Sequence, residues 1–260
     1  MILRRLSQSL KEQNWTAIVI EFILLVVGVF LGIQVANWNT DREQDRKSAV
    51  FTERIKANLR VEAWNLEMQI GYYGQVQANA RRAADALSGQ APLSDEALLV
   101  AAFRATQYND NTRQRTTFDE LKSTGELGLI RDSGLRTLAM DVFTIPVFEQ
   151  VAEEGRASPF RVAFRKRVPY RVQAALEDAC GDHVVPTGDY SGIATALDYP
   201  CRVDLPATEI AAAASALRGD PDMLALLNLR IVNVGTSIGN LTVYSPTLRP
   251  GLRTFVKEKP

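Results

Sequence analysis

The feature that most constrains the fold is a continuous apolar segment, WTAIVIEFILLVVGVFLGIQVANW, which lies between Trp15 and Trp38. At a helical rise of about 1.5 Å per residue it covers roughly 36 Å, which exceeds the roughly 30 Å hydrocarbon core of a bilayer. Tryptophan rings favour the headgroup region, so a tryptophan at each end is typical of a membrane span. The segment therefore predicts one transmembrane helix over residues 15–38, and a buried core helix is the alternative.

The position of this segment predicts the domain organisation. Residues 1–14 form a short tail, expected in the cytoplasm, and residues 39–260 are numerous enough to form a domain with its own core. Because QVANWN, which ends the segment, is a poor match to a small-residue cleavage site, we expect a retained signal-anchor. The flanking Lys and Arg residues leave the orientation open, since long domains cross membranes largely regardless of such charges.

The cysteines bear on the orientation. The two of them, Cys180 and Cys201, flank a stretch rich in glycine and proline at about residues 181–206. A disulfide closing such a loop stabilises a fold by roughly 3 kcal/mol in the chain-entropy model. Disulfides persist in oxidising compartments, so this pair indicates a periplasmic or equivalent exterior location for the C-terminal domain. Two unpaired thiols are the alternative.

A metal site is a further alternative at the same loop. Cys180 and His183 stand three residues apart, as do Cys201 and Asp204, and the four could form a ligand set. His183 is the chain's single histidine, and no further cysteine is available. A solvated loop histidine explains the pattern equally simply, so we expect no metal and no cofactor.

The charge balance indicates the class of partner. The chain carries 30 Lys and Arg against 30 Asp and Glu, nearly all after residue 39, which argues against a polyanion partner and predicts no binding of nucleic acid. One basic stretch, FRVAFRKRVPYR, contains Arg161, Arg165, Lys166, Arg167 and Arg171. It could contact anionic lipid headgroups or nucleic acid, but a solvated helix face is the simpler interpretation.

Apolar spacing after the segment is helical throughout. Residues 41 to about 88 predict one long helix that continues the transmembrane helix. Shorter helices are expected over 94–105, over 117–123 with a Thr117–Glu120 capping box and a stop at Gly125, from 132 to Pro146, over 158–179 and over 206–217. No convincing alternating strand is found; residues 184–185 are the best candidate.

The last predicted helix begins near Asp220 and has a coiled-coil-like seam of apolar positions. The seam comprises Leu224, Leu227, Ile231, Val234, Ile238 and Leu241. Such a helix is expected at the centre of an antiparallel bundle. The predicted fold class is therefore all-α, with one N-terminal transmembrane helix continuing into a long helix and an antiparallel helical bundle.

Two segments carry a family resemblance. EFILLVVGVFLGIQVANWN, with its acid, glutamine and terminal WN, and TTFDELKSTGELGLI resemble the hallmark segments of an uncharacterised bacterial family of single-span membrane proteins. The resemblance covers about 35 residues. It implies one N-terminal span in the bacterial inner membrane and a helical domain of unknown function, and it supplies no activity.

Catalytic motifs are not found in the sequence. It contains no HExxH or Walker motif, no GxGxxG after a strand, and no GxSxG elbow between a strand and a helix, because the one GxSxG match, GTSIG at residues 235–239, lies inside a predicted helix. One histidine also leaves little room for a charge-relay triad. Adjacent carboxylates, at Asp119 and Glu120 and at Glu153 and Glu154, predict solvated charges because neighbours on a helix face different directions. We therefore expect a protein that is not an enzyme.

The transmembrane helix has one distinctive face. Taking Glu21 as zero, a turn of about 100° per residue places Gly28 at about −20°, Gly32 at about +20° and Ala36 at about +60°. Small residues four apart permit close approach of helices, and acids inside a membrane usually face protein or water. These four residues predict an assembly face; Glu21 could instead snorkel to the interface or relay protons.

The combined expectation is a membrane-anchored, non-enzymatic protein. It lies in the bilayer, associates with itself or with another membrane protein through the transmembrane helix, and binds a partner or ligand through its helical domain. Two other functions stay open. One is a metal-dependent enzyme sited at the 180–204 loop, and the other is an accessory subunit of a transporter or proton-driven complex.

Overall fold

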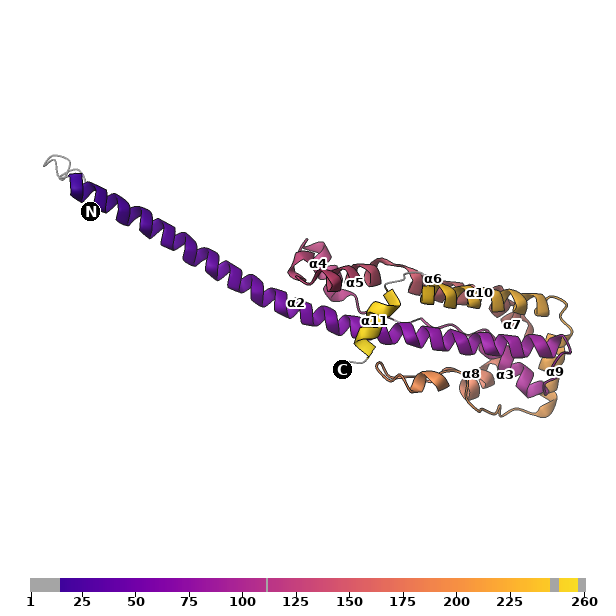
Figure 1. The fold of residues 1–260 in the computed structure, drawn as a ribbon. Coiled ribbons are helices and arrows are strands. Elements are labelled where there is room, and N and C mark those ends of the chain that lie inside the picture. Colours follow the sequence, from indigo (N-terminus) through magenta and orange to yellow (C-terminus); the bar gives the residue numbers. More distant parts are fainter. Residues whose placement is uncertain (1–14, 111, 244–247, 257–260) are drawn as a thin grey trace. The chain divides into compact units, whose positions relative to one another are not determined.

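The computed structural model describes residues 15–110, 112–243 and 248–256, and every regular element in these ranges is a helix. The all-α prediction is confirmed, and residues 184–185 lie in a loop, not in a strand. Figure 1 shows the arrangement of the helices. The expected cytoplasmic tail, residues 1–14, lies outside the described residues.

The first helix, α2, extends over Trp15–Leu87, so the predicted continuation of the apolar segment into a long helix is confirmed. The chain divides into two compact units, and α2 contributes to both. The first unit contains α2 up to Glu53 together with Gly128–Arg131, where the Ser48 hydroxyl donates to the Leu129 carbonyl at 2.6 Å. The second unit contains the remainder.

Nine further α-helices complete the described structure. Their bounds are α3 Asp95–Ala105, α4 Thr116–Ser123, α5 Ser133–Thr144, α6 Val147–Arg156, α7 Pro159–Arg167, α8 Tyr170–Cys180, α9 Ala207–Arg218, α10 Met223–Val243 and α11 Leu248–Val256. Short 3₁₀ turns lie at Leu127–Leu129 and Gly192–Thr195.

Helix ends follow local side-chain chemistry in most places. Ser94 caps α3 by accepting from the Ala97 N–H at 3.2 Å. Gly125 ends α4 at a φ of +72°, a conformation that glycine adopts without strain. The predicted capping box is wrong: α4 begins at Thr116, before Thr117, and the Glu120 carboxylate instead pairs with Arg54 at 3.0 Å.

A second prediction, of one continuous helix through Pro169, is wrong. One helix over residues 158–179 was expected to contain this proline, but α7 ends at Arg167 and α8 begins at Tyr170. Proline has no N–H to donate and its ring clashes with the carbonyl four residues earlier. The break redirects the chain, so that α7 and α8 form two walls of one pocket.

Helix α10 packs antiparallel to the second half of α2 (Figure 1). The Gln77 amide donates to the Ile231 carbonyl at 3.0 Å, whereas Arg249, further along the chain, pairs with Glu67 at 3.1 Å. The buried positions of α10 are Met223, Leu227, Arg230, Val234, Ser237 and Leu241. Half of the predicted seam is therefore correct, and its other members are only half-buried.

Candidate functional site

The apolar segment is the first candidate site. Of the described helices, only α2 contains a stretch long and apolar enough to cross a membrane, and none of that stretch is buried. Large side chains along it are exposed, for example Phe22 at 66% and Phe30 at 58%. A core helix of a soluble domain would bury such side chains, so the alternative of a buried core helix is not supported.

The four residues of the expected assembly face lie on α2, where the helical geometry is continuous. At about 100° per residue, Glu21, Gly28, Gly32 and Ala36 occupy an arc of about 80°. A Cβ atom added at Gly28 or Gly32 would meet no atom within 4 Å, so the surface there is open. The Oε2 atom of Glu21 is covered and has no hydrogen-bond partner among the described residues.

The structure joins Cys180 and Cys201 in a disulfide with a Cα–Cα distance of 5.4 Å. Both sulfur atoms are bonded to each other, which removes two of the four ligands of the alternative metal site. The His183 ring stacks on the Tyr199 ring with centroids 3.6 Å apart. In the described ranges, no group of three or more His, Cys, Asp and Glu side chains could hold a metal ion.

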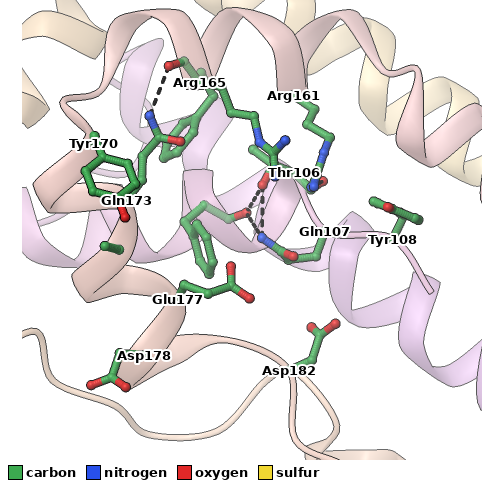
Figure 2. A pocket seen from close by; sticks show the side chains of 13 residues that line it. Thr106, Gln107, Tyr108, Arg161, Arg165, Tyr170, Gln173, Glu177, Asp178 and Asp182 are labelled. Carbon is green, nitrogen blue, oxygen red and sulfur yellow. Dashed lines mark hydrogen bonds between the residues drawn. The ribbon is translucent and has the colours of Figure 1, made fainter. Parts of the chain in front are cut away.

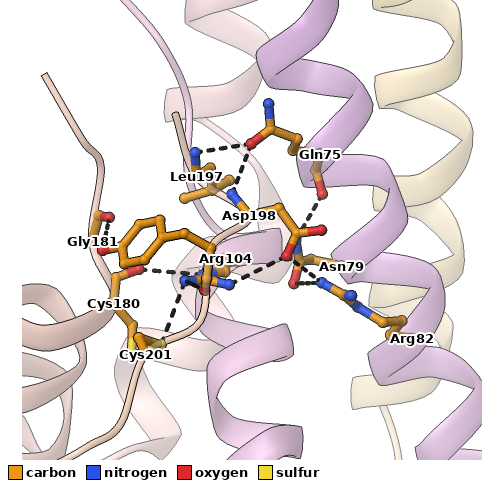
Figure 3. A network of polar contacts seen from close by, with 10 residues as sticks. Gln75, Asn79, Arg82, Arg104, Cys180, Gly181, Leu197, Asp198 and Cys201 are labelled. Atoms are coloured by element: carbon orange, nitrogen blue, oxygen red, sulfur yellow. Dashed lines mark hydrogen bonds and ion pairs between the residues drawn. A yellow bond between two sulfur atoms is a disulfide. The ribbon is translucent and has the colours of Figure 1, made fainter. Parts of the chain in front are cut away.

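Arg104 ties the loop after Cys180 to the helices (Figure 3). Its side chain is 4% exposed, and it donates to the carbonyls of Cys180 at 3.3 Å and Tyr199 at 2.8 Å and to the Asp198 carboxylate at 3.3 Å. Burial lowers the pKa of Arg104. From α2, the Gln75 side-chain oxygen accepts from the N–H groups of residues 197 and 198. The turn-rich stretch is thus held in place.

A pocket of about 840 Å³ is the second candidate site (Figure 2). It lies between α7, α8 and the residues that end and follow α3. Its lining residues are Phe103, Thr106, Gln107, Tyr108, Arg161, Phe164, Arg165, Tyr170, Gln173, Ala174, Glu177, Asp178 and Asp182. The volume falls in the range of about 300–1,000 Å³ that is usual for small-molecule sites.

One wall of the pocket is basic. Arg161 and Arg165 stand four residues apart on α7 and so share a helix face. The Arg161 guanidinium donates to the Thr106 carbonyl at 2.8 Å and lies 4.8 Å from the Tyr108 ring centroid. Burial lowers the pKa of Arg161, and the neighbouring charge of Arg165 lowers it further. Within the described chain, neither arginine has an ion-pair partner.

The opposite wall is acidic. Glu177 and Asp178 lie on α8, and Asp182 follows its end; Figure 2 shows them across the pocket from the two arginines. The Tyr72 hydroxyl, from α2, donates to Asp182 Oδ1 at 2.8 Å. Burial raises the pKa of Asp182, and the hydrogen bond from Tyr72 opposes that shift. Positive and negative side chains therefore face each other without contact.

The structure corrects the interpretation of the basic stretch as a solvated face. Arg161 is half-buried and lines the pocket, as does exposed Arg165. Arg167 and Arg171 are exposed and form ion pairs with Asp220 at 2.6 Å and with Glu209 at 3.1 Å. The solvated-face prediction therefore holds for the exposed Arg165, Lys166, Arg167 and Arg171 and fails at Arg161.

Arg230 is a buried charged residue whose role the apolar spacing of α10 does not reveal. Its side chain is fully buried, pairs with Glu154 at 2.7 Å, and donates to the carbonyls of Ala105 at 3.1 Å and Gln107 at 2.9 Å. Glu154 is therefore not the solvated charge predicted for it. The visible signal was a lone arginine in an otherwise uncharged helix, but its partners lie far away in the sequence.

The chain matches no protein-family model, no curated protein and no solved structure. Functional assignment therefore depends on the apolar segment and the pocket.

Proposed function

We propose that this is a membrane-anchored, non-enzymatic protein of the bacterial inner membrane. Its apolar segment associates with a second copy or with another membrane protein, and its periplasmic helical domain, residues 39–260, binds a partner or ligand. One observation carries the proposal: the exposed apolar segment of α2 presents Glu21, Gly28, Gly32 and Ala36 on a single face.

The exposure of the segment supports membrane anchoring. Monomeric soluble proteins rarely expose contiguous apolar patches larger than a few hundred Å². Here the large side chains from Val19 to Val35 are about half exposed or more, on every side of the helix. In a bilayer, lipid tails surround such a surface on every side, so the apolar side chains are removed from water without further protein contacts.

The face within the segment supports association. Glycines four residues apart let a second helix approach closely, which improves van der Waals packing between the two helices. Faces with large side chains keep the helices further apart. A charged side chain near the bilayer centre costs on the order of 2.5–3.5 kcal/mol on insertion scales, and less near the interface. Since Glu21 Oε2 has no partner in the described chain, a hydrogen-bond donor on a neighbouring helix would lower this cost.

The Cys180–Cys201 disulfide supports a periplasmic location for the helical domain, because disulfides persist in oxidising compartments. The pocket supports a binding role. Its lining residues include no Ser, Cys or His, and the Thr106 hydroxyl donates to the Phe103 carbonyl at 2.6 Å. Opposite charges that face each other across a pocket without a Ser, Cys or His beside them suit recognition of a charged ligand better than Ser- or Cys-dependent acyl transfer.

The test is chemical cross-linking of the full chain in native bacterial membranes. Gly28→Leu combined with Gly32→Leu should abolish the cross-linked species, because bulky side chains prevent close helix contact. The matched control is Val26→Leu with Phe30→Leu, which lie near the opposite face and should cross-link like the parent. A chain that washes off membranes in alkaline carbonate, or recovery of a monomer only, would overturn the proposal.

A further inference from the structure

We infer that the pocket between α7 and α8 binds a small zwitterion, a molecule that carries an ammonium group and a carboxylate or phosphate group. The inference deepens the proposed function, on which it rests, by naming the chemical class of ligand for the helical domain. It is carried by the separation of charge across the pocket.

The basic wall calls for an anionic group. Arg161 and Arg165 project from neighbouring turns of α7 toward the same space, as Figure 2 shows. Two adjacent guanidinium groups repel each other, and the described chain offers neither of them a carboxylate within 4.0 Å. An oxyanion can accept hydrogen bonds from both groups and relieve this repulsion.

The acidic wall calls for a cationic group. Glu177 and Asp182 face the same space, Asp178 lines the pocket beside them, and the described residues form no ion pair with any of the three. Other charged residues nearby are paired, for example Arg167 with Asp220 and Arg171 with Glu209. Within the described chain, the pocket thus holds side chains of both signs of charge that lack an ion-pair partner.

The two walls together exclude simpler ligands. A purely anionic ligand would face the carboxylates of Glu177 and Asp182, and a purely cationic ligand would face the two arginines. A zwitterion places each charge against its opposite and completes both walls at once. The rings of Phe103 and Phe164 are buried beside it and supply an apolar surface for the spacer between the charges.

The volume and the fixed positions of the walls favour a small molecule. About 840 Å³ accommodates a ligand of small-molecule size. Gln107 and Thr106 at the back of the pocket are buried and hydrogen-bonded to each other at 3.1 Å. Arg161 is held by its hydrogen bond to the Thr106 carbonyl, so part of the site is formed before a ligand arrives.

Two sources provide this chemistry: a phosphate-bearing headgroup and a carboxylate-bearing amino acid or peptide. Titration calorimetry of the full chain in mild detergent separates them with O-phosphoethanolamine and dialanine as probes. Inorganic phosphate and ethanolamine serve as half-ligands. At least one zwitterion should bind at least tenfold more tightly than either half-ligand. If neither does so, or if phosphate alone binds as tightly as the zwitterions, the inference is overturned.

Matched variants locate the site. Arg165→Ala and Glu177→Gln alter exposed residues on opposite walls, and each should weaken binding of the preferred zwitterion at least tenfold. Lys166→Ala removes an exposed charge from the same helix outside the pocket and should change affinity less than twofold. Unchanged thermal midpoints establish that the variants fold. Parent-like binding by Arg165→Ala would overturn the assignment.

Failure here and failure of the proposed function are distinguishable. Cross-linking of the apolar segment in membranes does not depend on the pocket. If the parent chain cross-links but binds no zwitterion, only the ligand class is rejected. If the parent chain does not cross-link, the proposed association is rejected.

Discussion

At the scale of single residues, the buried arginine of α10 has the greatest expected effect on stability. Arg230→Met leaves Glu154 and the carbonyls of Ala105 and Gln107 without their donor. Removing one partner of a buried pair typically costs about 3–5 kcal/mol. Urea unfolding in detergent should show a loss of this order.

The control for this prediction is Arg156→Met. Arg156 is half exposed and pairs with Glu153 at 3.1 Å and with Asp110, and because solvent screens such surface pairs, its replacement should change stability much less than that of Arg230. Equal losses for the two variants would contradict the importance assigned to Arg230.

Tyr73 gives a prediction about pH. Its side chain is fully buried, and burial raises its pKa from 10.0 to about 12. The folded protein therefore keeps a proton that the unfolded chain releases above pH 10, so stability falls as the pH rises from 10 to 12. The fall due to Tyr73 is roughly 2–3 kcal/mol at most. Tyr73→Phe should reduce the alkaline loss of stability measured by urea unfolding without abolishing it, because burial also raises the pKa of Tyr72.

The control is Tyr170→Phe, whose ring is 84% exposed. It should keep the parent's dependence on pH. A Tyr73→Phe variant with the parent's alkaline slope would show that Tyr73 does not cause the loss.

Residue-level features were predictable where the signal is local. The stop at Gly125 and the start of α3 after Ser94 depend on neighbouring backbone groups, and both are confirmed. The pairing of Arg230 with Glu154 joins residues 76 positions apart, and no spacing rule reveals it. The charges of the pocket come from two helices and a loop, so the sequence showed a basic stretch but not its acidic counterpart.

At the scale of elements, two glycines of α2 should respond oppositely to alanine. A Cβ atom at Gly74 would meet nothing within 4 Å, so Gly74→Ala should stabilise by up to about 1 kcal/mol through helix propensity. A Cβ atom at Gly71 would overlap Ile193 of the 3₁₀ turn, and overpacking typically costs about 1–3 kcal/mol. Thermal midpoints compare the two, and a stabilised Gly71→Ala variant would contradict the packing described here.

The disulfide gives a second prediction at this scale. Cys180 and Cys201 are 21 positions apart, for which the chain-entropy model gives about 3 kcal/mol. Replacing both by alanine should lower the free energy of unfolding by about this amount while helical circular dichroism is retained, because Arg104 and Gln75 still hold the loop. An unchanged unfolding midpoint would show that the disulfide contributes little.

Helices were predictable from apolar spacing, but their breaks and faces were only partly so. Pro169 ended a helix that was expected to continue, because the proline ring and its missing N–H outweigh the apolar pattern on either side. In α10 the true buried face includes Arg230 and Ser237 in place of two leucine or isoleucine positions. Contacts with residues distant in the sequence, such as the pairing of Arg230 with Glu154, determine which face is buried, and the local pattern does not encode them.

At the scale of the whole molecule, two separate surfaces carry the proposed roles. Association is proposed for the apolar segment and ligand binding for the pocket, and the two surfaces share no residue. Arg165→Ala should therefore leave cross-linking in membranes unchanged, and the Gly28→Leu, Gly32→Leu pair should leave zwitterion affinity unchanged. A shared loss in either variant would show that the two roles depend on each other.

The most direct test of the central claim is site-specific photocross-linking along the apolar segment in native membranes. A photoreactive residue placed at position 28 or 32 should form protein adducts, either with a second copy or with another membrane protein. The same residue at position 26 or 30, near the opposite face, should react mainly with lipid. Equal adduct yields at all four positions, or no protein adducts at any of them, would contradict an assembly face built on Glu21, Gly28, Gly32 and Ala36.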